Sequence, residues 1–291
     1  MSQRMAHPVP RGDMMHRLWF ITNPGSGTAT QAKCDAIEAA FRERGVDLVG
    51  RTGFPEDALP TATQLDEHRV DTVILFAGDG TINATLDALR DWQGKFLILP
   101  GGTMNLLAKG LHDTLDPGEI ITAAYRRSAT VALPFVEAGP NRAYVGLILG
   151  PAAHWFRARE EVRKRRFARL WRVARHAWTR TFGRGLRIVG VPGLRRGYQA
   201  VFAHPDPHGI ELSGIDARDW RSIIELGWTF ASGEWATAAP VTRVIVAQFT
   251  LGGSKPVLGL FDGEPVTLDP GTRIGCGISA QIFIDTRKED M

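Results

Sequence analysis

The N-terminal part of the chain alternates between short apolar runs and segments of helical periodicity, and this alternation constrains the fold more strongly than any other feature. The apolar runs lie at residues 17–22, 46–50, 72–77 and 96–99. The helical segments lie at residues 28–44, 55–69, 81–90 and 104–110, and the first has an apolar side and ends before Gly45. Strands that alternate with helices pack into a parallel sheet with helices on both faces. We therefore predict an α/β domain over residues 17–128.

The second half of the chain changes character, because strand-like runs separated by turn residues such as Gly139-Pro140 now dominate. The runs lie at residues 129–137, 143–149, 186–191, 198–203, 223–230, 243–251 and 257–261. This pattern predicts an antiparallel β-sandwich over residues 129–279, interrupted by one long helical segment at 154–182.

The first sixteen residues and the cysteines indicate a cytoplasmic protein. Residues 1–16 are polar, contain two prolines and lack the apolar core of a signal peptide, so we expect a disordered leader, with Met14 or Met15 as alternative starts. The two cysteines, Cys34 and Cys276, form neither a disulfide framework nor a closely spaced metal pair. No apolar run approaches the roughly 18 residues of a membrane span, so we expect any membrane contact to be peripheral.

Three glycine-rich loops follow apolar runs of the first domain. They are residues 23–28, 78–83 and 100–105, and each also contains small hydroxyl or amide side chains. Ligands of open parallel sheets bind beyond the carboxyl ends of the strands, and glycines let backbone amides approach phosphate oxygens. Thr81 and Thr103 open helices, whose N-termini favour an anion. A single loop of this kind would be an ordinary turn, but three at successive strand ends predict a phosphate site.

Neither a P-loop nor a Rossmann glycine fingerprint is present, so phosphate charge would be neutralised by backbone amides and a metal ion. The segments Asn23-Pro-Gly-Ser-Gly27, Gly78-Asp-Gly-Thr-Ile-Asn83 and Leu99-Pro-Gly-Gly-Thr-Met-Asn105 resemble the nucleotide-binding motifs of the diacylglycerol kinase catalytic-domain family. Phe261-Asp-Gly-Glu264 resembles the late D-G-E of that family, and the order and spacing agree over residues 17–285. The family includes bacterial lipid kinases, sphingosine kinases and ceramide kinases.

The resemblance implies an ATP-dependent lipid kinase that uses Mg²⁺. It implies an NAD-kinase-like N-terminal domain and a C-terminal β-sandwich, with the active site in the cleft between them and a last strand near residues 280–286 returning to the first domain. Glu264 would accept the proton of the lipid hydroxyl, with Asp262 beside it, and Asp79 would support the metal-bound phosphates. The residues assigned in this way to the nucleotide are Asn23, Ser26, Gly27, Thr52, Ala77, Gly78, Asp79, Gly80, Thr81, Asn83, Gly102, Thr103 and Asn105.

The chain departs from the family pattern in two places. Ala77 replaces the usual glycine before Gly78, which is a mild change because alanine is also small. The family commonly has an Asp-Gly pair in the sandwich that helps to hold a metal ion, and residues 212–219 do not keep it. Asp216 or Asp219 would be the metal ligand there, within a broken pattern.

The pair Asp262 and Glu264 also fits the chemistry without the resemblance. Phosphoryl transfer requires positioning, charge stabilisation and a carboxylate or similar group oriented on the attacking hydroxyl. The two carboxylates flank Gly263 between strand runs, in a turn from which a side chain can project into a cleft. The alternative is a solvated hairpin turn, since Asp-Gly is a common hairpin signal.

Positive charge is concentrated in one segment of the second half. Residues 155–180 contain ten Arg or Lys against two Glu, a local charge of +8, whereas the whole chain has a net charge of +4. The apolar side chains that recur there at helical spacing are Phe167, Trp171, Ala174, Trp178 and Phe182. Such a helix suits the interface of an anionic membrane, which predicts peripheral attachment through residues 155–182. The alternative is a helix packed on the sandwich with a solvated basic face.

Three other functions fit parts of the sequence. An NAD-kinase-like enzyme with a soluble substrate would share the N-terminal architecture, but the late D-G-E and the basic aromatic segment favour a lipid. A nucleic-acid-binding protein would explain the pI of about 9.3, but it would leave the three phosphate-type loops unexplained, and no recognised nucleic-acid module is present. A regulatory pseudokinase is disfavoured because all the motif carboxylates are present. No residue distinguishes a diacylglycerol-like from a sphingolipid-like or ceramide-like acceptor, and the oligomeric state is left open.

Overall fold

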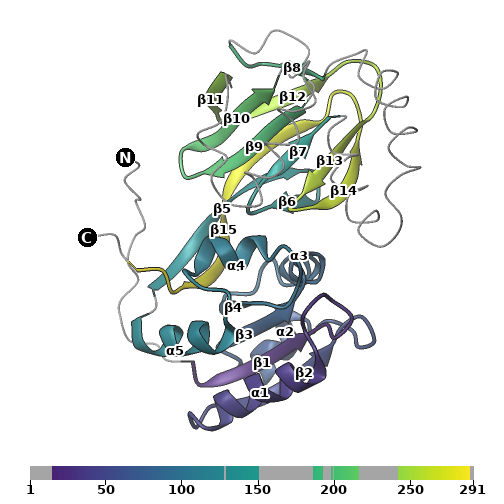
Figure 1. The fold of residues 1–291 in the computed structure, drawn as a ribbon. Coiled ribbons are helices and arrows are strands. Elements are labelled where there is room, and N and C mark those ends of the chain that lie inside the picture. The colour runs from purple at the N-terminus through teal and green to yellow at the C-terminus, as the bar shows by residue number, and fades with distance from the viewer. Residues whose placement is uncertain are drawn as a thin grey trace, which may run out of the picture. The chain divides into compact units, whose positions relative to one another are not determined.

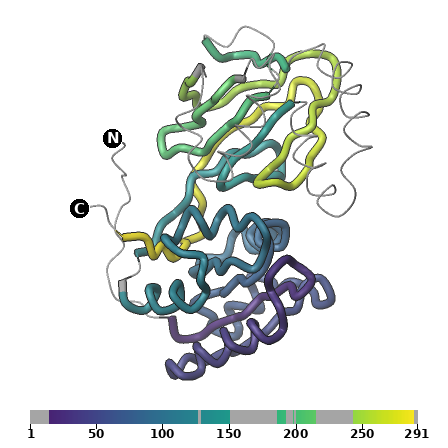
Figure 2. Tube along the Cα trace, viewed as in Figure 1, coloured from purple at the N-terminus to yellow at the C-terminus, as the bar shows by residue number. Residues whose placement is uncertain are grey.

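The computed structural model describes residues 15–127, 129–150, 186–192, 198, 200–215 and 242–288. The chain folds into two compact units (Figure 1). Unit 1 comprises the residues up to Leu133 together with those from Ile278 onward, and unit 2 comprises Pro134–Gly277. Two long strands, β5 (Ala129–Ala138) and β15 (Arg273–Asp285), run from one unit into the other. In Figure 2 the yellow C-terminal strand accordingly enters the unit that is otherwise purple to teal.

The sheet of unit 1 is parallel and has the strand order β2-β1-β3-β4-β15. The bounds of its first four strands are β1 (Arg17–Thr22), β2 (Asp47–Gly53), β3 (Thr72–Ala77) and β4 (Lys95–Pro100). All residues of β3 are buried, as expected for a parallel strand whose two faces are both covered. The predicted α/β class of this domain is confirmed.

The helices of unit 1 are α1 (Gln31–Arg42), α2 (Ala62–Glu67), α3 (Asp79–Ala88), α4 (Leu106–Leu111) and α5 (Pro117–Arg127). Helix α5 has no counterpart among the segments predicted from the sequence. Helix α2 is shorter than the predicted segment 55–69, because a capping box formed by Thr61 and Gln64 sets its start. Helix α3 begins earlier than predicted, at Asp79, so that Gly78 is its N-cap. None of the helices in the described ranges is both long and apolar enough to cross a membrane.

Apolar side chains cover both faces of the unit 1 sheet. On one face, Phe41 of α1 and Ile120 of α5 lie in one cluster with Leu97 of β4. Successive side chains of a strand point to opposite faces, so the neighbouring Phe96 lies on the other face. There its ring centroid is 5.8 Å from that of Phe283, which belongs to β15. The C-terminal strand is therefore part of the core of unit 1.

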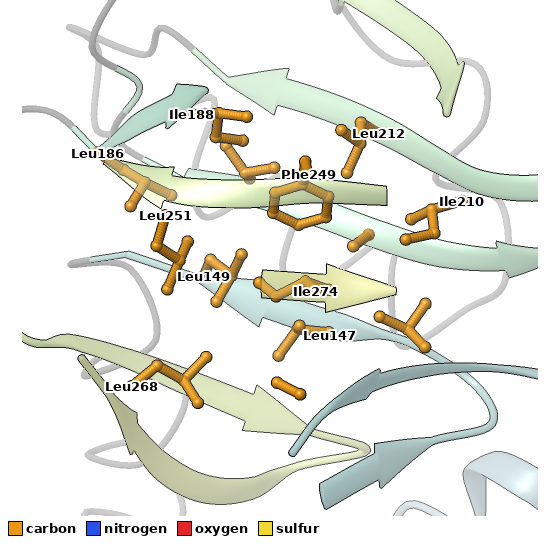
Figure 3. Packing of buried hydrophobic residues seen from close by; sticks show 14 of the residues in the cluster. Leu147, Leu149, Leu186, Ile188, Ile210, Leu212, Phe249, Leu251, Leu268 and Ile274 are labelled. Carbon is orange, nitrogen blue, oxygen red and sulfur yellow. The ribbon is translucent and has the colours of Figure 1, made fainter. Parts of the chain in front are cut away.

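Unit 2 is an antiparallel β-domain built from two sheets. One sheet has the order β11-β10-β9-β7-β13-β14, and in the other β12 lies between β15 and β8. The bounds are β6 (Asn141–Ala143), β7 (Leu147–Leu149), β8 (Arg187–Val189), β9 (Ala200–Asp206), β10 (Gly209–Ile215), β11 (Thr242–Val246), β12 (Gln248–Gly252), β13 (Val257–Phe261) and β14 (Glu264–Leu268). Figure 3 shows Phe249 and Ile274 from one sheet in a single apolar cluster with Leu147, Leu149 and Leu212 from the other. The predicted class of the second domain is confirmed.

Two predicted strands of unit 2 are divided in the structure. Segment 143–149 is interrupted at Tyr144–Gly146, between β6 and β7. Segment 243–251 is divided at Ala247 into β11 and β12. Strand β11 pairs with β10 in one sheet, and β12 pairs with β15 in the other, so the chain changes sheets at this residue. Strands β10 and β14 were not predicted, and the predicted strand at 223–230 lies outside the described residues.

Candidate active site

The three glycine-rich loops of unit 1 contact one another directly through their backbones. A Cβ atom added at Gly27 would lie 2.8 Å from the carbonyl carbon of Gly102, and one added at Gly102 would lie 2.6 Å from the Cα of Gly78. Real Cβ atoms essentially never approach other atoms so closely, so glycine is needed at these contacts. The loops therefore form one surface, which follows the carboxyl ends of β1, β3 and β4.

Hydrogen bonds join the same loops. The N–H of Thr28 in the first loop donates to the carbonyl oxygen of Gly101 in the third loop at 3.0 Å. The N–H of Gly78 in the second loop donates to Ser26 Oγ at 3.1 Å, and this hydroxyl donates to the carbonyl oxygen of Asn23 at 2.7 Å. The first loop is thus tied to both of the others.

The first loop also contacts the start of α3. Asn23 Nδ2 donates to Thr81 Oγ1 at 2.9 Å, and Asn23 Oδ1 accepts the N–H of Gly25 at 2.9 Å. Within the described part of the chain, no side chain caps α3, whose N-cap is Gly78. The backbone N–H groups of an uncapped helix start favour a bound anion, so this corner of the loop surface suits a phosphate group.

Asp79 links the second loop to the third. Its Oδ2 accepts the N–H of Asn105 at 3.1 Å, and its Oδ1 accepts the N–H of Leu106 at 2.8 Å. The two bonds hold the start of α4 in place. Burial raises the pKa of Asp79, and this effect is larger than the opposing effect of the two amide hydrogen bonds.

Asn105 shapes the third loop from within. Its φ of +51° lies in the left-handed region, which asparagine tolerates better than most residues. Its Oδ1 accepts the N–H of Gly102 at 2.8 Å, and its Nδ2 donates to the Gly102 carbonyl oxygen at 3.2 Å. Thr103 lies between Gly102 and Asn105 in the sequence. It is exposed whereas those two residues are buried, so its side chain is open to a ligand.

The other residues predicted to bind the nucleotide have different surroundings. Thr52 is buried on β2, and its hydroxyl accepts the Nε1–H of Trp19 at 3.0 Å. Ala77 is fully buried at the end of β3, directly before the second loop. The buried Nδ2 of Asn83 has no hydrogen-bond partner within the described part of the chain. Asn83 therefore offers a donor that the described structure does not use, whereas Thr52 already has a partner within the sheet.

Asp262 and Glu264 belong to unit 2, in the hairpin between β13 and β14. Phe261 pairs with Glu264, and the two residues between them, Asp262 and Gly263, have φ of +47° and +95°. Two positive φ values define a type I′ hairpin turn, so the hairpin alternative describes the local backbone correctly. The two carboxylates differ in access, because Asp262 is 5% exposed whereas Glu264 is exposed. Of the two side chains, that of Glu264 is therefore the more accessible to solvent.

Some residues that bind the carboxylates of Asp79 and Asp262 were not predicted from the sequence. Leu106 binds Asp79 through its backbone N–H, and the interrupted segment Tyr144–Gly146 binds Asp262 in the same way. His204, on β9, contacts that segment as well. No motif marks these groups, and the one available signal is the glycine at the end of the interrupted segment.

Two predicted features lie outside the described residues, namely Asp216 and the basic segment 154–182. Within the described ranges, no group of three or more His, Cys, Asp or Glu side chains is arranged to hold a metal ion.

The fold has an α/β unit that carries the surface of three glycine-rich loops, and an antiparallel β unit. Residues 17–133 match the family described as "Diacylglycerol kinase catalytic domain". The match covers less than half of the 291 residues, and over these residues the resemblance to this family seen in the sequence is confirmed.

Individual proteins show the same likeness. A curated protein of Streptococcus pneumoniae serotype 4, described as "Putative lipid kinase", is 39% identical over 116 residues, which are 35% of this chain and 36% of the relative. The match therefore spans about a third of the length of that relative. A crystal structure described as a diacylglycerol kinase from Bacillus anthracis superposes with a TM-score of 0.62 at 14% identity, covering 94% of this chain and 98% of that one. Because the identity to this crystal structure is 14%, the similarity to it concerns the fold alone.

Proposed function

We propose that the protein is an ATP-dependent lipid kinase, which transfers the γ-phosphoryl group of ATP to a lipid hydroxyl. The observation that carries the proposal is the direct backbone contact of Gly27, Gly78 and Gly102 beside the uncapped start of α3. Such a surface suits the phosphates of a nucleotide. The family match of residues 17–133 supports a lipid acceptor over a soluble substrate or a nucleic acid.

In this proposal the loops and the first turn of α3 hold the nucleotide, and Glu264 accepts the proton of the lipid hydroxyl. Orientation and charge stabilisation dominate phosphoryl transfer, because the protein performs little covalent chemistry. Mg²⁺, when bound, neutralises charge on the phosphoryl oxygens. Asp79 fits such an ion, because an ionised carboxylate has about four lone-pair sites and backbone N–H groups use two of those on Asp79.

Asp79→Asn is expected to reduce turnover about 10- to 100-fold, the usual loss when a group that supports a metal is changed. The asparagine loses the charge and presents an NH₂ group to a backbone N–H of Asn105 or Leu106. One unsatisfied donor costs about 1–3 kcal/mol, so the protein should stay folded. Steady-state kinetics and thermal unfolding check both points. Asp87→Asn, an exposed carboxylate on the same helix, is the control. Activity that survives both Asp79→Asn and EDTA would remove the metal from the mechanism.

We further propose that the segment 155–182, which lies outside the described residues, attaches the protein to the anionic cytoplasmic face of a membrane. Each Arg or Lys near such a surface contributes about 1 kcal/mol before screening. A diacylglycerol-like and a sphingolipid-like or ceramide-like alcohol both present a hydroxyl at this surface. The attachment would therefore bring the enzyme to its acceptor.

Replacing Arg165, Arg166, Arg169 and Arg172 together with Gln is expected to weaken binding to anionic liposomes at low salt. The attraction of each guanidinium falls off within a Debye length, so raising the salt concentration should weaken wild-type binding in the same way. Liposome sedimentation measures both effects, and ATP titration of the variant should give the wild-type affinity. Equal sedimentation of the two proteins at low salt would exclude electrostatic attachment through this segment.

The kinase activity itself is tested with radiolabelled ATP and a panel of acceptors. Diacylglycerol, sphingosine and ceramide are presented in mixed micelles with and without Mg²⁺, NAD serves as a soluble acceptor, and the products are separated by chromatography. We expect a labelled lipid that requires Mg²⁺. Labelled NAD without labelled lipid would favour the soluble-substrate alternative, and no labelled product with any acceptor would refute the proposed function.

A further inference from the structure

We propose that Asp262 is a positioning residue for Glu264 rather than a proton acceptor, and that His204 assists it. The two side chains clamp the backbone of Tyr144–Gly146, and the clamp holds the hairpin turn that presents Glu264. The inference rests on the proposed function, because it concerns the base of that reaction. All of these residues lie within unit 2.

The carboxylate of Asp262 accepts three backbone hydrogen bonds. Its Oδ2 accepts the N–H of Tyr144 at 2.7 Å, and its Oδ1 accepts those of Val145 at 2.9 Å and Gly146 at 2.8 Å. In return, the N–H of Asp262 donates to the carbonyl oxygen of Gly146 at 3.0 Å. Hydrogen bonds to an ionised acceptor are stronger than those between neutral groups. The irregular course of the chain between β6 and β7 is thus built around this side chain.

His204 holds the same segment through a carbonyl group. Its Nδ1 lies 2.8 Å from the carbonyl oxygen of Val145. A carbonyl oxygen can only accept, so Nδ1 carries the proton in this contact. Val145 is therefore bound at both polar groups of its backbone, by Asp262 at the N–H and by His204 at the oxygen.

The clamp acts on Glu264 through the turn. Asp262 has a φ of +47° and Gly263 a φ of +95°, and Glu264 follows directly as the strand partner of Phe261. A non-glycine residue keeps a positive φ when surrounding contacts maintain it. The turn cannot rotate without breaking the three hydrogen bonds of the Asp262 carboxylate, so these bonds fix the direction in which Glu264 leaves the turn.

Asp262 is poorly placed to take up a proton itself. It is 5% exposed. Its two oxygens have about four lone-pair sites, and backbone N–H groups occupy three of them. A general base must come within hydrogen-bond reach of the hydroxyl that it deprotonates, and the exposed Glu264 is more accessible to such a group than Asp262 is.

Asp262→Asn tests the assignment kinetically. Asparagine tolerates a positive φ, so the turn preference is kept, but one amide oxygen remains for three N–H groups. We expect kcat to fall by about tenfold or more, as for a misplaced catalytic group. The KM for Mg-ATP should not change. The acidic limb of the pH profile of kcat should stay at its wild-type position, because Glu264 is intact.

His204 offers a matched pair of variants. His204→Leu removes the donor to Val145 and should lower kcat by a smaller factor than Asp262→Asn. His204→Asn provides an amide N–H in place of Nδ1 and should restore most of the activity. A kcat equal to wild type in His204→Leu would remove His204 from the clamp.

Amide hydrogen exchange of the full chain, measured without substrate, gives a readout that does not depend on activity. We expect Tyr144–Gly146 to exchange faster in Asp262→Asn and to be unchanged in Glu264→Gln. Wild-type kcat in Asp262→Asn, loss of its acidic limb, or unchanged exchange would each overturn the proposal. If wild-type protein phosphorylates no lipid, the proposed function fails, whereas the exchange comparison still decides whether the clamp exists.

Discussion

Glu264→Gln is expected to lower lipid phosphorylation by a factor on the order of 10² or more, the usual contribution of a general base. Glutamine keeps the shape of the side chain but cannot accept a proton from the attacking hydroxyl. Glu264 is exposed at the first position of β14, so the change should leave the fold intact. The glycine-rich loops that we propose to bind the nucleotide belong to the other unit, so ATP affinity should not change. Turnover at saturating substrates and calorimetric ATP titration measure these quantities.

The matched control for this variant is Asp269→Asn. Asp269 is an exposed carboxylate directly after β14, and it should tolerate the same loss of charge with wild-type turnover. Wild-type turnover in Glu264→Gln would refute the assigned role of Glu264. An equal loss in both variants would instead indicate a general disturbance of the hairpin.

Gly102→Ala is expected to abolish ATP binding at concentrations that saturate the wild type. The new Cβ would lie 2.6 Å from the Cα of Gly78, which is a backbone atom and cannot turn aside. The third loop must then move away from the second, which separates the amides that we expect to bind phosphate. Forcing extra volume into a packed site typically costs about 1–3 kcal/mol, so the free energy of unfolding should fall by a similar amount. ATP titration and denaturant unfolding measure the two effects.

Gly110→Ala is the control for a glycine whose neighbourhood is open. Gly110 lies on α4, and a Cβ there would meet nothing within 4 Å. Alanine favours a helix over glycine by up to about 1 kcal/mol, so this variant should bind ATP normally and be slightly more stable. ATP binding by Gly102→Ala at wild-type affinity would show that nucleotide binding does not depend on the contact between the loops.

The position of the loops could be predicted from sequence because glycine reports directly on close backbone approach. The contact between Gly27 and Gly102 is an example, since a larger residue at either position is excluded. The partners of Asp79 could not be predicted in this way. They are the backbone N–H groups of Asn105 and Leu106, and every residue type except proline has such a group.

The interrupted strand in unit 2 shows the same limit. The composition of the apolar run at 143–149 fits a single strand. The composition of the Asp-Gly pair at 262–263 fits a hairpin turn. Each prediction concerns a local pattern. The interruption at Tyr144–Gly146 results from hydrogen bonds to Asp262, whose sequence separation from the segment is 116 to 118 positions. A contact of this range leaves no periodic signal in either segment.

Strand β15 makes the completion of unit 1 depend on a strand that is synthesised after most of unit 2. Phe283 is fully buried near Phe96, and Gln281 donates to the carbonyl oxygens of Leu86 and Leu89 at the end of α3. Synthesis proceeds from the N-terminus, so the edge of β4 lacks its neighbour until β15 leaves the ribosome. An unpaired strand edge is a template for pairing with other chains. The glycine-rich loops are therefore all synthesised before β15, yet the nascent protein carries an unpaired strand edge beside them until β15 is added.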